Sequence, residues 1–135
     1  MAFFIHPNLC LLFFRDREGK FTPERLKQVL EDEGVTVTGE KQPFALRWGD
    51  GPTLYASMER GKVAEILASR LMDGRDQEHR GLIAGCDAYI EVAFESLDEV
   101  LEEINTLIVV QGALQQATGG LMCRSWNQTF SGPGD

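Results

Sequence analysis

The sequence has few of the residues from which metal sites and disulfide frameworks are built. It contains two histidines, His6 and His79, and three cysteines, Cys10, Cys86 and Cys123, in 135 residues. The histidines form no H-x-x-H or H-E-x-x-H motif, so no metal site is predicted. The cysteines form no C-x-x-C pair and their number is odd, which argues against a disulfide framework and favours a reducing compartment.

Motifs for nucleotide binding and nucleophilic catalysis are also missing. No G-x-G-x-x-G, Walker or G-x-S-x-G sequence occurs. Glu91 and Glu95 share one face of a predicted strand about 13 Å apart, too far to act on one bond, so Glu91 is expected to pair with Arg47 or Arg124. Cys123, beside Arg124, is the only cysteine with a hint of a thiolate setting, and each cysteine is expected to be a small buried hydrophobe. No catalytic residue and no cofactor is predicted.

Positive charge is scarce, and it is almost absent from the last third of the chain. Lys and Arg number 13 against 21 Asp and Glu, which gives a net charge of −8. Residues 1–34 carry a net −1 and residues 35–85 a net of zero, whereas residues 86–135 carry eight acidic side chains and one basic side chain, Arg124. Nucleic-acid binders usually have a basic face, and anionic lipid attracts basic segments, so neither nucleic acid nor a membrane is a predicted partner.

Long apolar runs are absent too. The run near the N-terminus, Leu9 to Phe14, has six residues, whereas a membrane-spanning helix needs about 20. Residues 1–5 are apolar, but no basic segment precedes them and no small-residue cleavage site follows. The sequence therefore predicts a soluble, cytoplasmic protein of a bacterial type.

The apolar patterning predicts one α+β domain over residues 1–130, followed by a flexible tail over residues 131–135. Its core is a β-α-β-β-α-β unit with an additional C-terminal long helix and strand. This is a ferredoxin-like sandwich, in which helices cover one face of a mainly antiparallel sheet. The predicted strands are 9–14, 35–38, 44–48, 53–59, 87–94 and 121–126, and the predicted helices are 22–34, 62–72, 77–84 and 96–117.

The hairpin around residue 50 has a predicted register. A three-residue loop over residues 49–51, with Gly51 left-handed, brings the apolar residues of both strands to one face, whereas a four-residue loop would split them. The expected pairs are Leu46 with Leu54 and Phe44 with Ala56.

Residues 96–117 are predicted to form one helix about 30 Å long, opened by a capping box of Ser96 and Glu99. Its first half is amphipathic through residues 97, 100, 101 and 104. Residues 107–110 are apolar on every side, which is typical of a helix that is deeply buried or shared with a partner. Gly112 favours a close backbone approach, because glycine inside a helix is otherwise unfavourable. The apolar segment and an open sheet face predict a homodimer.

Acidic residues cluster around the start of this helix. Part of the cluster has a structural explanation, because the helix dipole favours negative charge in the first turn and the other residues can form a solvated face. The functional interpretation is a surface for a basic protein, which would accelerate association and select against acidic proteins. The candidate partner-binding residues are Glu95, Asp98, Glu99, Glu102 and Glu103.

Four aromatic residues are candidates for lining a ligand pocket, although ordinary amphipathic packing is the simpler explanation for them. They are Trp48, Tyr55, Tyr89 and Trp126. If these residues line a pocket, the chain is a small ligand-binding or enzymatic domain that is ferredoxin-like and dimeric.

In size, charge and class the chain resembles small acidic α+β proteins of the immunity type, which neutralise a basic toxin or effector. The likeness rests on these general properties and on no specific motif. Together with the missing catalytic motifs, it implies a non-catalytic interaction module with an acidic surface for a basic partner. The ligand-binding domain is the alternative.

Overall fold

The structure is a computed structural model that describes residues 8–61, 86–124 and 129–131. Some of the predictions fall outside the described residues. They are the helices predicted at 62–72 and 77–84, the tail after residue 131, and Trp126. Its elements, in chain order, are β1 (Leu9–Phe14), α1 (Pro23–Asp32), β2 (Thr36–Thr38), β3 (Phe44–Arg47), β4 (Leu54–Arg60), β5 (Ala88–Ala93), α4 (Leu97–Glu102), α5 (Ile104–Thr118), β6 (Leu121–Arg124) and β7 (Thr129–Ser131).

The strands form one sheet of order β2-β3-β4-β5-β1-β6-β7, and each neighbouring pair is antiparallel. The α+β class and the antiparallel sheet are thus confirmed. The apolar run of β1 lies between β5 and β6, as expected of a buried central strand. The ferredoxin-like topology is not confirmed, because the sheet continues past β4 into β3 and β2 and its strand order differs.

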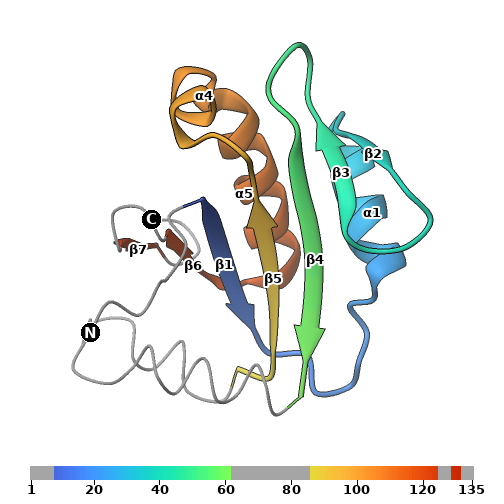
Figure 1. The fold of residues 1–135 in the computed structure, drawn as a ribbon. Helices are drawn as coiled ribbons and strands as arrows, with labels where there is room; N and C mark the ends of the chain where they lie inside the picture. Colours follow the sequence, from blue (N-terminus) through green and yellow to red (C-terminus); the bar gives the residue numbers. More distant parts are fainter. Residues whose placement is uncertain (1–7, 62–85, 125–128, 132–135) are drawn as a thin grey trace.

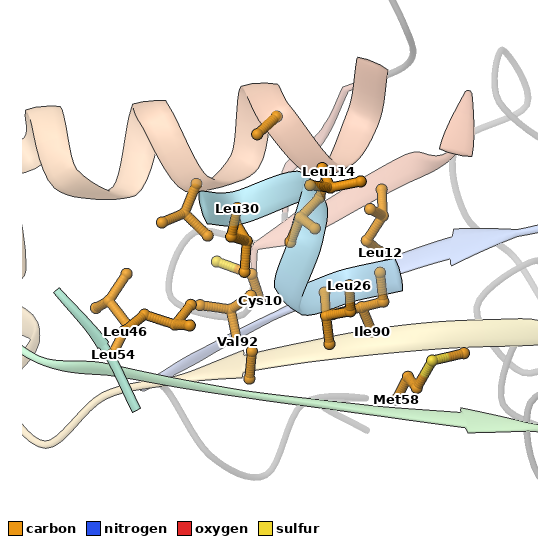
Figure 2. Close-up of a cluster of buried hydrophobic side chains, with 14 of the residues drawn as sticks. Cys10, Leu12, Leu26, Leu30, Leu46, Leu54, Met58, Ile90, Val92 and Leu114 are labelled. Carbon is orange, nitrogen blue, oxygen red and sulfur yellow. The ribbon is translucent and has the colours of Figure 1, made fainter. Parts of the chain in front are cut away.

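Helices α1 and α5 cover one face of the sheet (Figure 1). Thr22 caps α1 by accepting a hydrogen bond from the Arg25 backbone N–H at 3.1 Å, and Pro23 occupies the first helical position. Figure 2 shows the resulting core, in which apolar side chains of both helices meet those of β1, β3, β4 and β5. The helices contribute Leu26, Val29, Leu30, Leu107, Val110 and Leu114 to this core.

The hairpin register is as predicted, with Leu46 opposite Leu54. Phe44 lies opposite Ala56, so both apolar pairs face the helices. The conformation predicted for Gly51 is wrong, because the left-handed residue is Gly49, with φ of +59°. Gly51 is buried, and a Cβ added to it would lie 2.0 Å from Thr106 Oγ1. The glycine is needed for close approach to α5.

The single helix predicted over residues 96–117 is wrong. Two helices, α4 and α5, are separated at Glu103, whose φ of −115° and ψ of 52° are not helical. Ser96 caps α4 as predicted, with its Oγ accepting from the Glu99 backbone N–H at 3.2 Å. Because of the break, α4 lies beyond the end of the sheet while α5 runs back along it (Figure 1).

Most of the apolar segment 107–110 packs into the core of the chain. Leu107 and Val110 are buried and Val109 is half-buried, whereas Ile108 is exposed. Gly112 has open space where a Cβ would stand, so the predicted close approach at this residue is wrong. The segment therefore leaves a single exposed side chain for any partner.

The second face of the sheet is only partly open. On β5 the alternation is as predicted, with Ile90 buried toward the helices and Tyr89 half-buried on the second face. On β1 and β6, however, residues of the second face are also buried, among them Phe13 and Cys123. The predicted open face is thus restricted to β2, β3, β4 and β5, where residues of the second face are exposed or half-buried. Within the described residues, no helix is long and apolar enough to cross a membrane.

Candidate interaction surface

The five predicted acidic residues lie together around α4, at the end of the sheet where β5 stops. We call them the acidic surface: Glu95, Asp98, Glu99, Glu102 and Glu103, all of them exposed. A hydrogen bond of 3.1 Å from Asn8 Nδ2 to the Glu95 carbonyl fixes the chain between β5 and α4 to the start of β1. The acidic surface is therefore anchored to the central strands.

Helix capping accounts for only part of the acidic surface. Asp98 and Glu99 lie in the first turn of α4, where the helix dipole favours negative charge. Glu102 is the last residue of α4, where the helix dipole disfavours negative charge. Glu103 occupies the N-cap position of α5 but makes no side-chain capping bond. Glu95 precedes the cap. Three carboxylates thus have no capping role.

No ion pair among the described residues neutralises the acidic surface. The two ion pairs found there join Lys20 to Glu18 at 2.8 Å and Arg60 to Asp16 at 2.7 Å, both outside α4 and its flanks. The ion pair predicted for Glu91 is wrong, because Glu91 lies opposite Leu11 and Ser57 in the sheet.

Tyr55 joins the acidic surface in a small cavity. The cavity has a volume of about 160 Å³ and lies between the start of β4, the end of β5 and α4. Its lining includes the buried residues Phe94 and Val100 together with Tyr55, Glu95 and Glu99. The residues around the cavity thus include one tyrosine and two glutamates, residue types that attract a cation by ring quadrupole and by charge.

The three aromatic candidates that the structure describes, Trp48, Tyr55 and Tyr89, do not converge on one pocket. Trp48 packs against the core on the helix side of the sheet, whereas Tyr55 belongs to the second face. Tyr89 lies opposite Glu59, four positions along β4 from Tyr55 and so about 13 Å away. Burial raises the pKa of Tyr89, and the nearby Glu59 and Glu91 raise it further.

Tyr89 packs instead on Phe13, with the two ring centroids 5.7 Å apart. Its half-buried ring therefore belongs to the packing of the second face. Of the three described aromatic candidates, Tyr55 alone lines a cavity with any of the predicted acidic residues.

Sequence reasoning missed an exposed apolar stripe beside the acidic surface. Its three residues are the exposed large hydrophobic side chains of the described part of the chain: Leu101 (44% exposed), Ile104 (36%) and Ile108 (56%). The amphipathic pattern placed Leu101 and Ile104 in the core, but the break at Glu103 leaves Val100 as the buried residue of α4. We call these three residues the apolar stripe.

Two further cavities lie at the opposite end of β1. They share Phe14, Arg15 and Thr118, and have volumes of about 430 Å³ and 210 Å³. The smaller one is also lined by Asp16, Lys20 and Arg25. The larger one is within the size range of small-molecule sites, but Trp48, Tyr55 and Tyr89, the described aromatic candidates, do not line it.

The three cysteines are buried free thiols. Burial raises the pKa of Cys10 to about 12, although a hydrogen bond from Gln111 and the charge of Arg124 lower it. Gln111 Nε2 donates to Cys10 Sγ at 3.3 Å, and Arg124 Nη2 donates to Gln111 Oε1 at 3.1 Å. Only the thiolate is nucleophilic, and the raised pKa keeps the Cys10 thiol protonated at neutral pH, so Cys10 is a structural residue. Within the described ranges, no three His, Cys, Asp or Glu side chains are grouped as metal ligands.

Comparison of the chain with protein-family models, with curated proteins and with solved structures finds no match.

Proposed function

We propose that the chain is a non-catalytic interaction module that binds a basic protein through its acidic surface. The observation that carries this proposal is the concentration of five exposed carboxylates around α4 with no ion pair to any described residue. Three of them, Glu95, Glu102 and Glu103, have no capping role. Charges that serve only solubility need no such concentration on one element.

The acidic surface would act mainly on the rate and selectivity of association. Exposed carboxylates spaced within one Debye length, about 8 Å at physiological salt, add their fields and steer a basic partner toward α4. An acidic competitor would be repelled by the same field. Binding is therefore expected to weaken as ionic strength rises.

The test compares retention of proteins from the native source on two immobilised variants. The acidic variant, E95Q/E102Q/E103Q, removes three charges while leaving the first turn of α4 intact. The wild type is expected to retain a basic protein at low salt, and the acidic variant is expected to lose it.

The control variant, E31Q/E33Q/E40Q, removes the same number of exposed charges from the region of α1 and the loop after β2. It is expected to retain the partner as the wild type does. A partner retained equally by all three proteins, or retained equally at low and high salt, would contradict the proposal.

A ligand-binding function is the second candidate, and the cavity of about 430 Å³ near Arg15 and Thr118 favours it. Ligand sites of this kind are usually more apolar and bring several polar groups together. A thermal-shift screen with metabolites tests it. A ligand that raises the melting temperature of the wild type but not of an R15Q variant would support this function over the interaction module.

Two finer features of the chain are proposals as well. We infer a ferredoxin-like core of β4-β5-β1-β6 with α1 and α5, extended by β3, β2 and β7. The connections from β1 to β4 and from β5 to β6 each pass over one intervening strand, as in a split β-α-β unit. The three free thiols support a cytoplasmic location. The homodimer stays a prediction, and light scattering at micromolar concentration tests it.

A further inference from the structure

We propose that the apolar stripe is the docking site for the apolar face of a basic amphipathic helix in the partner. This inference rests on the proposed function and names the segment that the acidic surface would recognise. Its basis is the position of Leu101 in α4 and of Ile104 and Ile108 in α5, next to acidic residues that lie in α4 and at its two ends.

The apolar stripe spans the break between the two helices. Leu101 belongs to α4, whereas Ile104 and Ile108 belong to α5 and are four residues apart, the step that places side chains on one side of a helix. The two α5 residues extend over about 6 Å. Exposed apolar residues on one side of a helix form a surface on which a second helix packs, with its own apolar residues at the same step.

Charge selects the occupant of the apolar stripe. Glu102 and Glu103 lie directly between Leu101 and Ile104 in the chain, so a segment covering the stripe must accommodate carboxylates at its edge. A second copy of this chain would bring the same carboxylates to a two-fold interface, where like charges oppose each other. A helix with lysines or arginines beside its apolar face meets the carboxylates with complementary charge.

The cavity at Tyr55 provides an anchor beside the stripe. Glu99 lines the cavity and lies in α4, the helix that also carries Leu101. The volume of about 160 Å³ and the residue types of the lining, one tyrosine and two glutamates among them, fit the end of one lysine or arginine side chain. Arginine is among the residues that most often form hot spots at interfaces.

The test uses a synthetic helical peptide of about four turns with leucines on one face and lysines on the other. A second peptide of the same composition has its leucines scattered around the helix. In an NMR titration of the full chain, the first peptide is expected to shift backbone amides of residues 95–108, and the scattered peptide to bind at least about tenfold more weakly. Equal binding of the two peptides would overturn the inference.

Variants separate this inference from the proposed function. The L101Q/I104Q/I108Q variant alters exposed side chains only, so it should fold, and the melting temperature checks this. It is expected to bind the amphipathic peptide about tenfold more weakly than the wild type, while A117Q, an exposed change at the far end of α5, is expected to bind normally.

Unchanged binding by the triple glutamine variant would overturn the role of the stripe. If the acidic variant also bound the peptide as the wild type does, both the role of the stripe and the proposed function would be rejected. If only the acidic variant lost binding, the proposed function would stand and the apolar docking site would be rejected. A dimer in light scattering that is abolished by L101Q/I104Q/I108Q would assign the stripe to a second copy and overturn the proposal.

Discussion

Gly51, in the turn between β3 and β4, lies directly against Thr106 of α5. A Cβ at position 51 would stand 2.0 Å from Thr106 Oγ1, a distance that atoms cannot adopt without displacement, and 3.3 Å from the Thr106 Cβ, which is a tight contact. This contact joins the hairpin to the first turn of α5. It therefore fixes α5, and with it α4, relative to the strands that form the Tyr55 cavity.

Replacing Gly51 with alanine is expected to destabilise the protein by about 1–3 kcal/mol, the usual penalty of an overpacked interior. Urea unfolding of G51A, T106A and the double variant measures it. The double variant should be more stable than the sum of the single effects predicts, since T106A removes the obstructing oxygen.

Gly112 provides the matched control in the same helix. Its Cβ position is open, so G112A should stabilise the protein by about 0.5–1 kcal/mol through its better helix propensity. Additive effects of G51A and T106A, or a destabilising G112A, would contradict the packing described for α5.

The second prediction concerns Asp16, which connects the loop after β1 to β4. Its carboxylate is 9% exposed and accepts hydrogen bonds from Arg60 Nη2 at 2.7 Å, from the Phe21 N–H at 2.8 Å and from the Lys20 N–H at 3.0 Å. Burial raises the pKa of Asp16, but these hydrogen bonds and the charge of Arg60 outweigh it, so the pKa is below the ordinary 3.8.

A lowered pKa means that the folded state stabilises the ionised carboxylate of Asp16 more than the unfolded state does. Its contribution is therefore complete above pH 3.8 and is lost as the pH falls through the folded value. D16N should cost about 1–2 kcal/mol at pH 7, because Arg60 is 39% exposed and solvent screens part of the interaction. Urea unfolding from pH 7 to pH 3 should show the two proteins converging in acid; a constant difference would contradict the role of the charge.

The third prediction concerns the buried thiols. With a pKa of about 12, roughly one Cys10 side chain in ten thousand is ionised at pH 8. Burial, offset in part by Arg15, also raises the pKa of Cys86. Iodoacetamide at pH 8, followed by mass spectrometry, should label neither residue in the native protein and both in urea. Rapid native labelling of Cys10 would show that the Gln111 contact does not close this site.

Much of the fold could be predicted because its signals are local. The Thr22 and Ser96 caps depend on side chains within three residues of the bonds they make. The hairpin register follows from the parity of its loop. The role of Gly51 depends on a contact between segments far apart in the sequence, and no local pattern reports such a contact.

The candidate site could also be predicted only in part. The acidic residues were found because their charge is visible in the sequence. The meeting of Tyr55 with Glu95 and Glu99 follows from the pairing of β4 with β5, which pattern alone did not give. Leu101 and Ile104 were placed in the core because an unbroken helix would have turned them there.

The binding affinity of the amphipathic lysine and leucine peptide, compared between the acidic variant and the control variant at low and at physiological salt, tests the central claim most directly. Both variants lose three carboxylates, so net charge is held equal and only the position of the charge differs. The acidic variant is expected to bind about tenfold more weakly than the control variant at low salt, with a smaller difference at physiological salt because the field is screened. Equal affinity of the two variants would show that net charge alone attracts the peptide, and would contradict a binding surface around α4.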